Sequence, residues 1–365
     1  MRRPQAFTPQ SLARFQKTLL EWFRAHRREL AWRASRDPYR VWIAEIMLQQ
    51  TRIAAVLPYY DRFLARFNDV DSLAKARESE VLKLWSGLGY YSRARNLHRA
   101  AKEIVARHNG HFPREFDAAL ALPGIGRYTA AAVLSIAYDA PVAVLDGNVA
   151  RVLARLFAIR GDLRSHGQWK RLGETAQRLL ARSAPCDWNQ ALMELGETIC
   201  TPRSPLCHVC PIAKRCRARS LGLTAAIPAP RRKAAAVRLK IAAAVLLDPR
   251  GRTLLVRDPG AHDDVLFSRM WQFPAVAVAR DAQRELAAYL RATLAIDCTN
   301  GTRLEALRTA RHAVTFRNIT LLPFLARIEK LPRLPCTRII RLDGLAHLPI
   351  SNATRKIAAA ASASG

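Results

Sequence analysis

The sequence predicts a mainly α protein with a smaller α+β domain in its C-terminal third. Apolar residues recur at helical spacing through the first two-thirds of the chain, and few segments there alternate with a period of two. Near residue 222 the composition changes to prolines, small residues and a basic run, which is typical of a linker. Strand-like segments follow it. We therefore predict an all-α domain at 1–222, a linker at 223–238 and an α+β domain at 239–362.

The helices of the first domain are placed by their caps and apolar spacing. Thr8-Pro9 is a helix start, with a capping hydroxyl and proline in the first turn. A second helix is expected from Pro38 to about Pro58. Further helices are expected at 72–86, 91–108, 115–121, 127–138, 147–158, 168–183 and 187–199.

The second domain begins with a strand signal. Leu239 to Leu247 is apolar and suits a strand, a turn follows at 248–251, and 253–256 returns as its partner. Asp281 to Leu294 reads as a helix, and 314–328 as strands.

The charge of the chain indicates its class of partner. Lys and Arg total 59 against 29 Asp and Glu, a net charge of +30. Such a basic globular protein usually meets a polyanion, nucleic acid first. A merely basic surface, or an anionic membrane, are the alternatives. The chain shows no run of about 18 apolar residues to span a bilayer and no signal-peptide core, so we expect a cytoplasmic protein with no membrane partner.

Four of the seven cysteines form a cluster with the spacing C-x6-C-x2-C-x5-C: Cys200, Cys207, Cys210 and Cys216. The odd total argues against a disulfide framework. Four thiolates within so short a segment suit one soft metal centre, and ligand type alone does not separate zinc from an iron–sulfur cluster. The spacing resembles the iron–sulfur loop of the endonuclease III superfamily of DNA glycosylases, which implies one [4Fe–4S] cluster.

A tight turn lies between two helical segments at Leu122-Pro123-Gly124-Ile125-Gly126. Its backbone N–H groups, at the start of the next helix, can bind a phosphate, although such a turn is often only a turn. In its setting it resembles the helix–hairpin–helix of the same superfamily. That resemblance assigns Gly124 and Gly126 to DNA contacts.

Two carboxylates stand where chemistry is expected. Glu45 lies in the middle of an apolar helix, and is either half of an ion pair or an acid whose pKa burial raises. Asp146 precedes a helix and suits a plain N-cap. The resemblance to the endonuclease III superfamily implies that an aspartate at this place is catalytic.

Two motifs name the family most closely. The segments 37–51 (DPYRVWIAEIMLQQT) and 84–97 (LWSGLGYYSRARNL) resemble the MutY adenine DNA glycosylases. The family removes adenine mispaired with 8-oxoguanine or guanine. The resemblance implies a helix–hairpin–helix glycosylase domain followed by a Nudix-like domain, with double-stranded DNA as partner. We expect a monomer of bacterial origin.

The resemblance also implies roles for single residues. Glu45 is the acid that protonates adenine and later activates water, and Asp146 stabilises the sugar cation, with Asn148 and Tyr128 as hydrogen-bonding partners. Tyr128 stands where bifunctional relatives carry a nucleophilic lysine, which implies little or no lyase activity. The flipped adenine needs a pocket and wedges, and the residues assigned to them are Arg28, Trp32, Arg33, Glu194, Gln50 and Tyr90.

The second domain departs from a working Nudix hydrolase. A working hydrolase of this kind needs an Arg-Glu-x-x-Glu-Glu array to hold Mg²⁺, whereas Arg284-Glu285-Leu286 is followed here by Ala287 and Ala288. The metal carboxylates are missing, which predicts no pyrophosphatase activity and favours a recognition role. By resemblance, His312 and Thr315 contact the base opposite adenine. Two other readings stay open: an endonuclease III-like pyrimidine glycosylase with lyase activity, and a DNA lesion-binding protein without catalysis.

Overall fold

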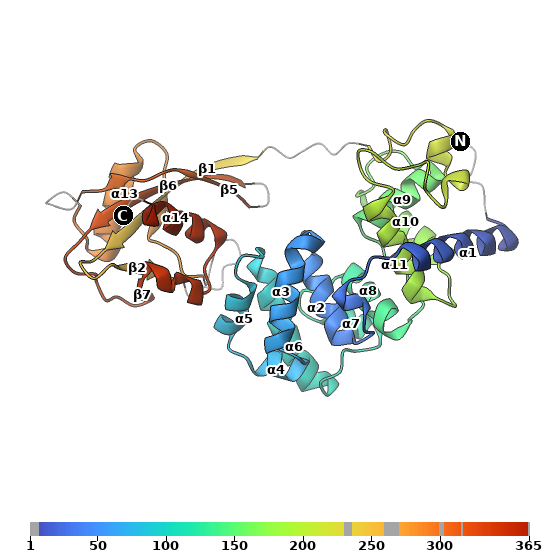
Figure 1. The fold of residues 1–365 in the computed structure, drawn as a ribbon, viewed down its shortest axis with the longest axis horizontal. Helices are drawn as coiled ribbons and strands as arrows, with labels where there is room; N and C mark the ends of the chain where they lie inside the picture. The colour runs from blue at the N-terminus through green and yellow to red at the C-terminus, as the bar shows by residue number, and fades with distance from the viewer. Residues whose placement is uncertain (1–6, 230–235, 259–269, 299–302, 315–316, 364–365) are drawn as a thin grey trace. The chain divides into compact units, whose positions relative to one another are not determined.

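A computed structural model describes residues 7–229, 236–258, 270–298, 303–314 and 317–363, which form two compact units (Figure 1). One unit comprises residues 1–75 and 96–232, and the other comprises 76–95 and 233–365. The second unit therefore includes a segment from inside the helical portion, although the sequence predicts one uninterrupted domain over 1–222.

The first unit is helical, as predicted. Its helices are α1 (Pro9–His26), α2 (Pro38–Leu48), α3 (Ile53–Arg66), α4 (Val70–Lys75), most of α6 (Tyr91–His108), α7 (Phe116–Ala121), α8 (Arg127–Tyr138), α9 (Gly147–Phe157), α10 (His166–Leu179), α11 (Pro185–Thr198) and α12 (Arg217–Ser220), with 3-10 turns η1 (Ala31–Arg33) and η2 (Ala213–Arg215). Helix α11 packs against α1, α8 and α9, and α2 packs against α8. Phe15, Leu153 and Trp188, one from each of α1, α9 and α11, share a buried core.

Two helix predictions were wrong in their extent. The segment expected as one helix from Pro38 to Pro58 is two helices, because the chain turns at Gln50, whose φ is +57°. Pro58 lies inside α3 and does not end it. The expected helix at 72–86 is likewise α4 and α5 (Glu78–Trp85), separated by an extended Arg77. Neither break carries a glycine or proline, so the sequence offers no local signal for it.

The second unit contains a mixed sheet with one long parallel pair. The strands are β1 (Val237–Leu247), β2 (Arg252–Val256), β3 (Ala275–Ala277), β4 (Glu305–Ala306), β5 (Ala310–Val314), β6 (Arg317–Arg327) and β7 (Thr337–Arg341). Their order is β4-β6-β1-β2-β7, with β3 on β1 and β5 on β6. Strands β1 and β6 are parallel from Val237↔Arg317 to Leu247↔Arg327. The first strand begins two residues before the expected Leu239.

Both faces of this sheet are covered, which explains the unbroken apolar run of β1. Ala243 and Val245 share a core with α14 (Asn352–Ser362), whereas Ala242, Ala244 and Leu246 share the opposite core with α13 (Ala282–Leu294). A 3-10 segment, η3 (Leu342–His347), precedes α14. The predicted α+β class of this part is confirmed.

Candidate active site

Glu45 lies on α2, surrounded by apolar side chains, and only 5% of it is exposed. Because α2 packs against α8, the second residue of α8 reaches it: the Tyr128 hydroxyl donates a 2.7 Å hydrogen bond to Glu45 Oε2. Burial raises the pKa of Glu45 to about 7, the hydrogen bond from Tyr128 opposes the rise, and the charge of Asp146 adds to it. Glu45 is thus a carboxylic acid that titrates near neutral pH, with its protonated and ionised forms both populated at pH 7.

Asp146 is the N-cap of α9, and its Oδ1 accepts a 2.7 Å hydrogen bond from the Val149 backbone N–H. Burial raises its pKa, and backbone N–H groups of the first turn oppose this. The structure confirms the helix cap, and the catalytic role of Asp146 stays a prediction. The cap fixes the carboxylate at the positive end of a helix, close enough to Glu45 to influence its titration.

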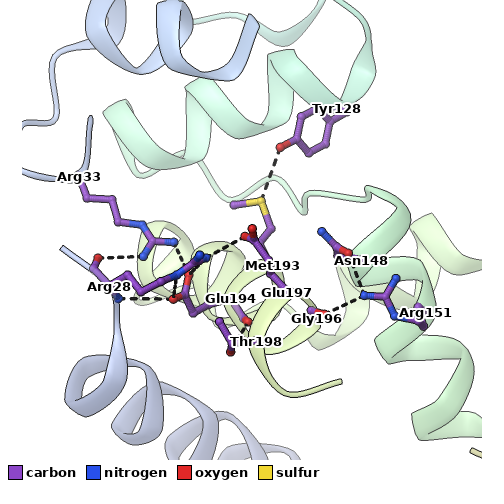
Figure 2. A network of polar contacts seen from close by, with 10 residues as sticks. All are labelled: Arg28, Arg33, Tyr128, Asn148, Arg151, Met193, Glu194, Gly196, Glu197 and Thr198. Carbon is purple, nitrogen blue, oxygen red and sulfur yellow. Dashed lines mark hydrogen bonds and ion pairs between the residues drawn. The ribbon is translucent and has the colours of Figure 1, made fainter. Parts of the chain in front are cut away.

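Asn148 is held by a residue that the sequence does not single out. Arg151 donates to Asn148 Oδ1 at 2.8 Å and to the carbonyl of Gly196 at 2.7 Å (Figure 2). It also donates to the carbonyl of Cys200 at 2.8 Å. A Cβ on Gly196 would lie 2.8 Å from Asn148 Cβ, so α11 approaches α9 closely only because residue 196 is glycine.

A second network centres on Glu194, whose side chain is 1% exposed. Arg28 binds both of its oxygens, at 2.6 and 2.9 Å, and Arg33 donates to Oε2 at 2.7 Å (Figure 2). Burial disfavours the ionised form of Glu194, but these hydrogen bonds hold its pKa below the ordinary value. Arg28 also contacts Glu197. The positive charge of Arg33 reaches Glu45 and lowers its pKa, so this network borders the buried acid.

These ion pairs join three of the predicted pocket residues, Arg28, Arg33 and Glu194, whereas Trp32 contacts a residue outside that set. Trp32 is 7% exposed and packs edge-on against Tyr60, with ring centroids 5.3 Å apart. Met193, which the sequence analysis missed, places its sulfur 3.7 Å from the Tyr128 hydroxyl (Figure 2). A lone methionine in an apolar helix carries no sequence signal for such a position.

Of the two glycines in the hairpin between α7 and α8, Gly124 and Gly126, the backbone requires glycine only at the first. Gly124 has φ +75°, and a Cβ there would lie 2.6 Å from Asn96 Cβ. Gly126 is the N-cap of α8, and in the described part of the chain no side chain caps that helix start. The structure thus forms the hairpin, while phosphate binding at it stays a prediction.

Gln50 and Tyr90, the two expected wedge residues, share an unusual backbone. Their φ values are +57° and +50°, in the left-handed region that residues other than glycine seldom adopt. Such strain persists where the surrounding structure enforces it, and it clusters at functional sites. Gln50 belongs to the first unit and Tyr90 to the second.

The expected contacts of the second domain are only partly described. His312 lies on β5, and burial together with the charge of Lys356 lowers its pKa. Thr315 lies outside the described residues.

The four cysteines line one cavity together with Arg155 and Ile199. Arg155 donates to Cys200 Sγ at 3.3 Å and to the carbonyls of Thr201 and Pro202, which ties α9 to the loop. Among the described residues, no three His, Cys, Asp or Glu side chains lie close enough together to hold one metal ion. The four thiols around this cavity are nevertheless the ligand set of an iron–sulfur cluster, so the site fits that cofactor by the chemistry of its donor atoms.

None of the helices described here is long and apolar enough to cross a membrane.

Comparisons with known proteins agree with this geometry. Residues 43–183 match the model of the HhH-GPD superfamily base excision DNA repair proteins, and 200–216 match the iron–sulfur binding domain of endonuclease III. The cysteine loop is thus an iron–sulfur site, and the cofactor is a [4Fe–4S] cluster.

Two curated relatives are similar to more than half of this chain. An adenine DNA glycosylase of Rattus norvegicus is 46% identical over 213 residues, covering 56% of this chain and 41% of the relative. One of Arabidopsis thaliana is 36% identical over 315 residues, covering 76% and 49%. The chain spans about half the length of the curated relatives it matches.

Among solved structures, a thermostable thymine-DNA glycosylase is 32% identical with a TM-score of 0.55, covering 59% of this chain and 100% of that one. Family model, relatives and fold agree, and the chain belongs to the HhH-GPD superfamily of base excision DNA repair proteins.

Proposed function

We propose that the protein is a monofunctional DNA glycosylase that removes adenine mispaired with 8-oxoguanine or guanine. The observation that carries this proposal is Glu45, a buried acid with a pKa of about 7, together with the helix-capping carboxylate of Asp146, whose charge adds to the rise of that pKa. The curated relatives named as adenine DNA glycosylases support it.

The chemistry needs an acid of this kind. Adenine leaves poorly as an anion, and protonation at N7 makes it a neutral leaving group. A carboxylic acid whose pKa lies near the working pH both carries the proton and releases it readily. Once deprotonated, Glu45 is a base that activates water, as in glycoside hydrolysis with two carboxylates.

Asp146 meets the second requirement. As the glycosidic bond breaks, the sugar gains oxocarbenium character, and an ionised carboxylate held in place by a helix start stabilises that charge. Asn148, fixed by Arg151, and Tyr128, which donates to Glu45, orient the reacting groups.

Strand cleavage through a Schiff base needs an amine, and position 128 is tyrosine. Burial and the neighbouring carboxylates raise the Tyr128 pKa well above its ordinary value, which makes the phenol still less nucleophilic. The proposed product is an abasic site in an intact strand.

DNA binding in this proposal uses the net charge of +30, the α8 hairpin and the wedge residues Gln50 and Tyr90. Arg28, Trp32, Arg33 and Glu194 line the pocket of the flipped adenine. The [4Fe–4S] cluster, when bound by the four cysteines, supplies a rigid structural anchor for the basic loop around it. We propose a monomer that acts on DNA in the bacterial cytoplasm.

For the domain at 239–362 we propose a Nudix-like fold that reads the base opposite adenine through His312 and Thr315. Glu285, an acid that remains where a hydrolase would bind Mg²⁺, accepts backbone N–H groups of Ala279, Arg280 and Asp281. Its carboxylate oxygens are thus occupied by hydrogen bonds that hold the start of α13. This agrees with a domain that recognises a base and does not hydrolyse a pyrophosphate.

The test uses end-labelled duplexes with one adenine opposite 8-oxoguanine, guanine or thymine, and one thymine opposite guanine. Half of each reaction is heated in alkali before electrophoresis. We expect breaks at adenine in the first two duplexes, and only after alkali.

Breaks at thymine opposite guanine would instead match the activity named for the solved relative. Breaks without alkali would favour an endonuclease III-like lyase. Binding without any break, in protein that retains its cluster, would leave a lesion-binding protein.

The pH dependence of excision should expose Glu45. Since the protonated acid is needed, the single-turnover rate should fall about tenfold per pH unit above the Glu45 pKa, which is about 7. The hydrogen bond from Tyr128 lowers that pKa, so Tyr128→Phe should move the alkaline limb to higher pH. Tyr59→Phe on α3 serves as the control and should leave it in place. If the rate of Tyr128→Phe begins to fall at the same pH as in the parent protein, or at a lower pH, the assignment of Glu45 as the acid is contradicted.

A further inference from the structure

The loop that presents Tyr90 has a strained backbone. Gly87, Gly89 and Tyr90 all have positive φ, at +108°, +79° and +50°. Tyr90 is nevertheless 37% exposed, one of the few large apolar side chains left open in the described chain. An exposed aromatic side chain on a strained loop needs neighbours that hold the loop in place.

Part of this support is local. The Trp85 indole N–H donates to the Gly89 carbonyl at 3.0 Å, and Arg93 donates to the same carbonyl at 3.3 Å. The Arg93 guanidinium lies 5.6 Å from the Trp85 ring centroid and 5.1 Å from that of Tyr90. These contacts fix one end of the loop.

The other end is held by residues more than 250 positions away in the same unit. Asn352 Nδ2 donates to the Gly87 carbonyl at 3.0 Å, and Arg355 donates to Ser86 Oγ at 2.9 Å. Ser86 Oγ and the Tyr91 hydroxyl both donate to the Ile350 carbonyl, at 2.7 and 3.2 Å. Four hydrogen bonds thus join the loop to the start of α14.

The same start of α14 is anchored in the sheet. Ile350 pairs with Trp271 as an isolated parallel bridge, and Gln272 pairs with Val256 at the end of β2. Ser351 is fully buried and caps α14 through the Thr354 N–H. Backbone pairs therefore connect the sheet to Ile350, and side-chain hydrogen bonds connect Ile350 and the start of α14 to the loop that carries Tyr90.

We propose that Asn352 and Arg355 are positioning residues for Tyr90: through Gly87 and Ser86 they hold the loop so that the Tyr90 ring is ready to contact DNA. Residues of α14 thereby affect how the protein binds the mispair, through the loop of residues 86–91 and separately from any contact that α14 itself makes with DNA. This inference rests on the proposed function, in which Tyr90 is a wedge.

Asn352→Asp is the most informative variant. It keeps the shape of the side chain, and a carboxylate at the first position of α14 suits the helix N-terminus, so the helix itself should not weaken. The Gly87 carbonyl, however, loses its donor and faces a negative charge. Asn109→Asp, at an exposed residue of the first unit that also has a positive φ, adds the same charge away from the loop and is the matched control.

The first measurement is hydrogen–deuterium exchange without DNA. In Asn352→Asp the amides of residues 87–93 should exchange roughly fivefold faster, as the loss of one hydrogen bond predicts. In Asn109→Asp they should match the parent protein. Unchanged exchange in Asn352→Asp would overturn the proposal.

The second measurement is a double-mutant cycle on binding to a duplex with adenine opposite 8-oxoguanine. All proteins carry Glu45→Gln, so that no turnover interferes. With Tyr90 present, Asn352→Asp should weaken binding roughly five- to tenfold. In a Tyr90→Ala background, Asn352→Asp should weaken binding no more than Asn109→Asp does. The two effects differ because the effects of residues that act through one another are not additive. Equal effects in both backgrounds would overturn the positioning role.

Failure of the proposed function would look different. If protein with Glu45 intact excises no base from any duplex while Asn352→Asp still loosens the loop and couples to Tyr90, the positioning role stands and the glycosylase assignment falls.

Discussion

Glu45→Gln should lower the single-turnover rate of adenine excision by about 10²–10⁴-fold, the usual contribution of a general acid. Glutamine keeps the volume and still accepts the hydrogen bond from Tyr128, but it has no proton to transfer. The rate is measured on the duplex with adenine opposite 8-oxoguanine, with protein in excess over DNA. Glu21→Gln, at an exposed position of α1, is the matched control and should retain the parent rate.

The same variant offers a check that is independent of activity. The Glu45 pKa rises from 4.5 to about 7 on folding, which corresponds to about 3 kcal/mol. Below pH 4.5 the acid is protonated in both states, and no penalty arises. Between pH 4.5 and 7 the unfolded chain ionises Glu45 while the folded protein keeps it protonated, so this margin of stability falls progressively and is lost once the pH has risen through 7.

Glu45→Gln should therefore unfold at a higher denaturant concentration than the parent at pH 8, and the gap should narrow at pH 5. Normal excision by this variant, or a gap that widens toward pH 5, would contradict the protonated buried acid.

Cys210→Ser should remove or destabilise the [4Fe–4S] cluster. Cys210 lines the cavity shared by the four cysteines, and serine is a poor ligand for iron in such a cluster. We expect loss of the broad absorbance near ~400 nm and a lower melting temperature, by about 2–4 °C for each kcal/mol lost in a domain of this size. The measurements are the visible spectrum, the iron content and thermal unfolding.

The control for this change is Cys336→Ser, an exposed cysteine in the second unit. It should keep the spectrum, the iron content and the melting temperature of the parent. Full iron content in Cys210→Ser, or one zinc ion and no visible absorbance in the parent protein, would contradict the assignment of the cluster.

Local signals predicted much of the helical architecture. The Thr8 cap, the helix at 91–108 and the helix at 127–138 are found at the expected boundaries, because caps and apolar spacing act within a few residues. The breaks at Gln50 and Arg77 were not predicted. There the chain turns to satisfy packing between distant helices, and no local residue preference marks the position.

The reactive groups can be listed from the residues alone: four closely spaced cysteines, an acid in an apolar helix, an aspartate before a helix and a turn that contains two glycines. Which of these groups come into contact follows from the packing of distant elements. Tyr128 reaches Glu45 across 83 positions, Arg28 reaches Glu194 across 166, and Asn352 reaches Gly87 across 265. Such pairs depend on how whole helices and sheets pack, and side-chain periodicity within one element contains no information about its distant neighbours.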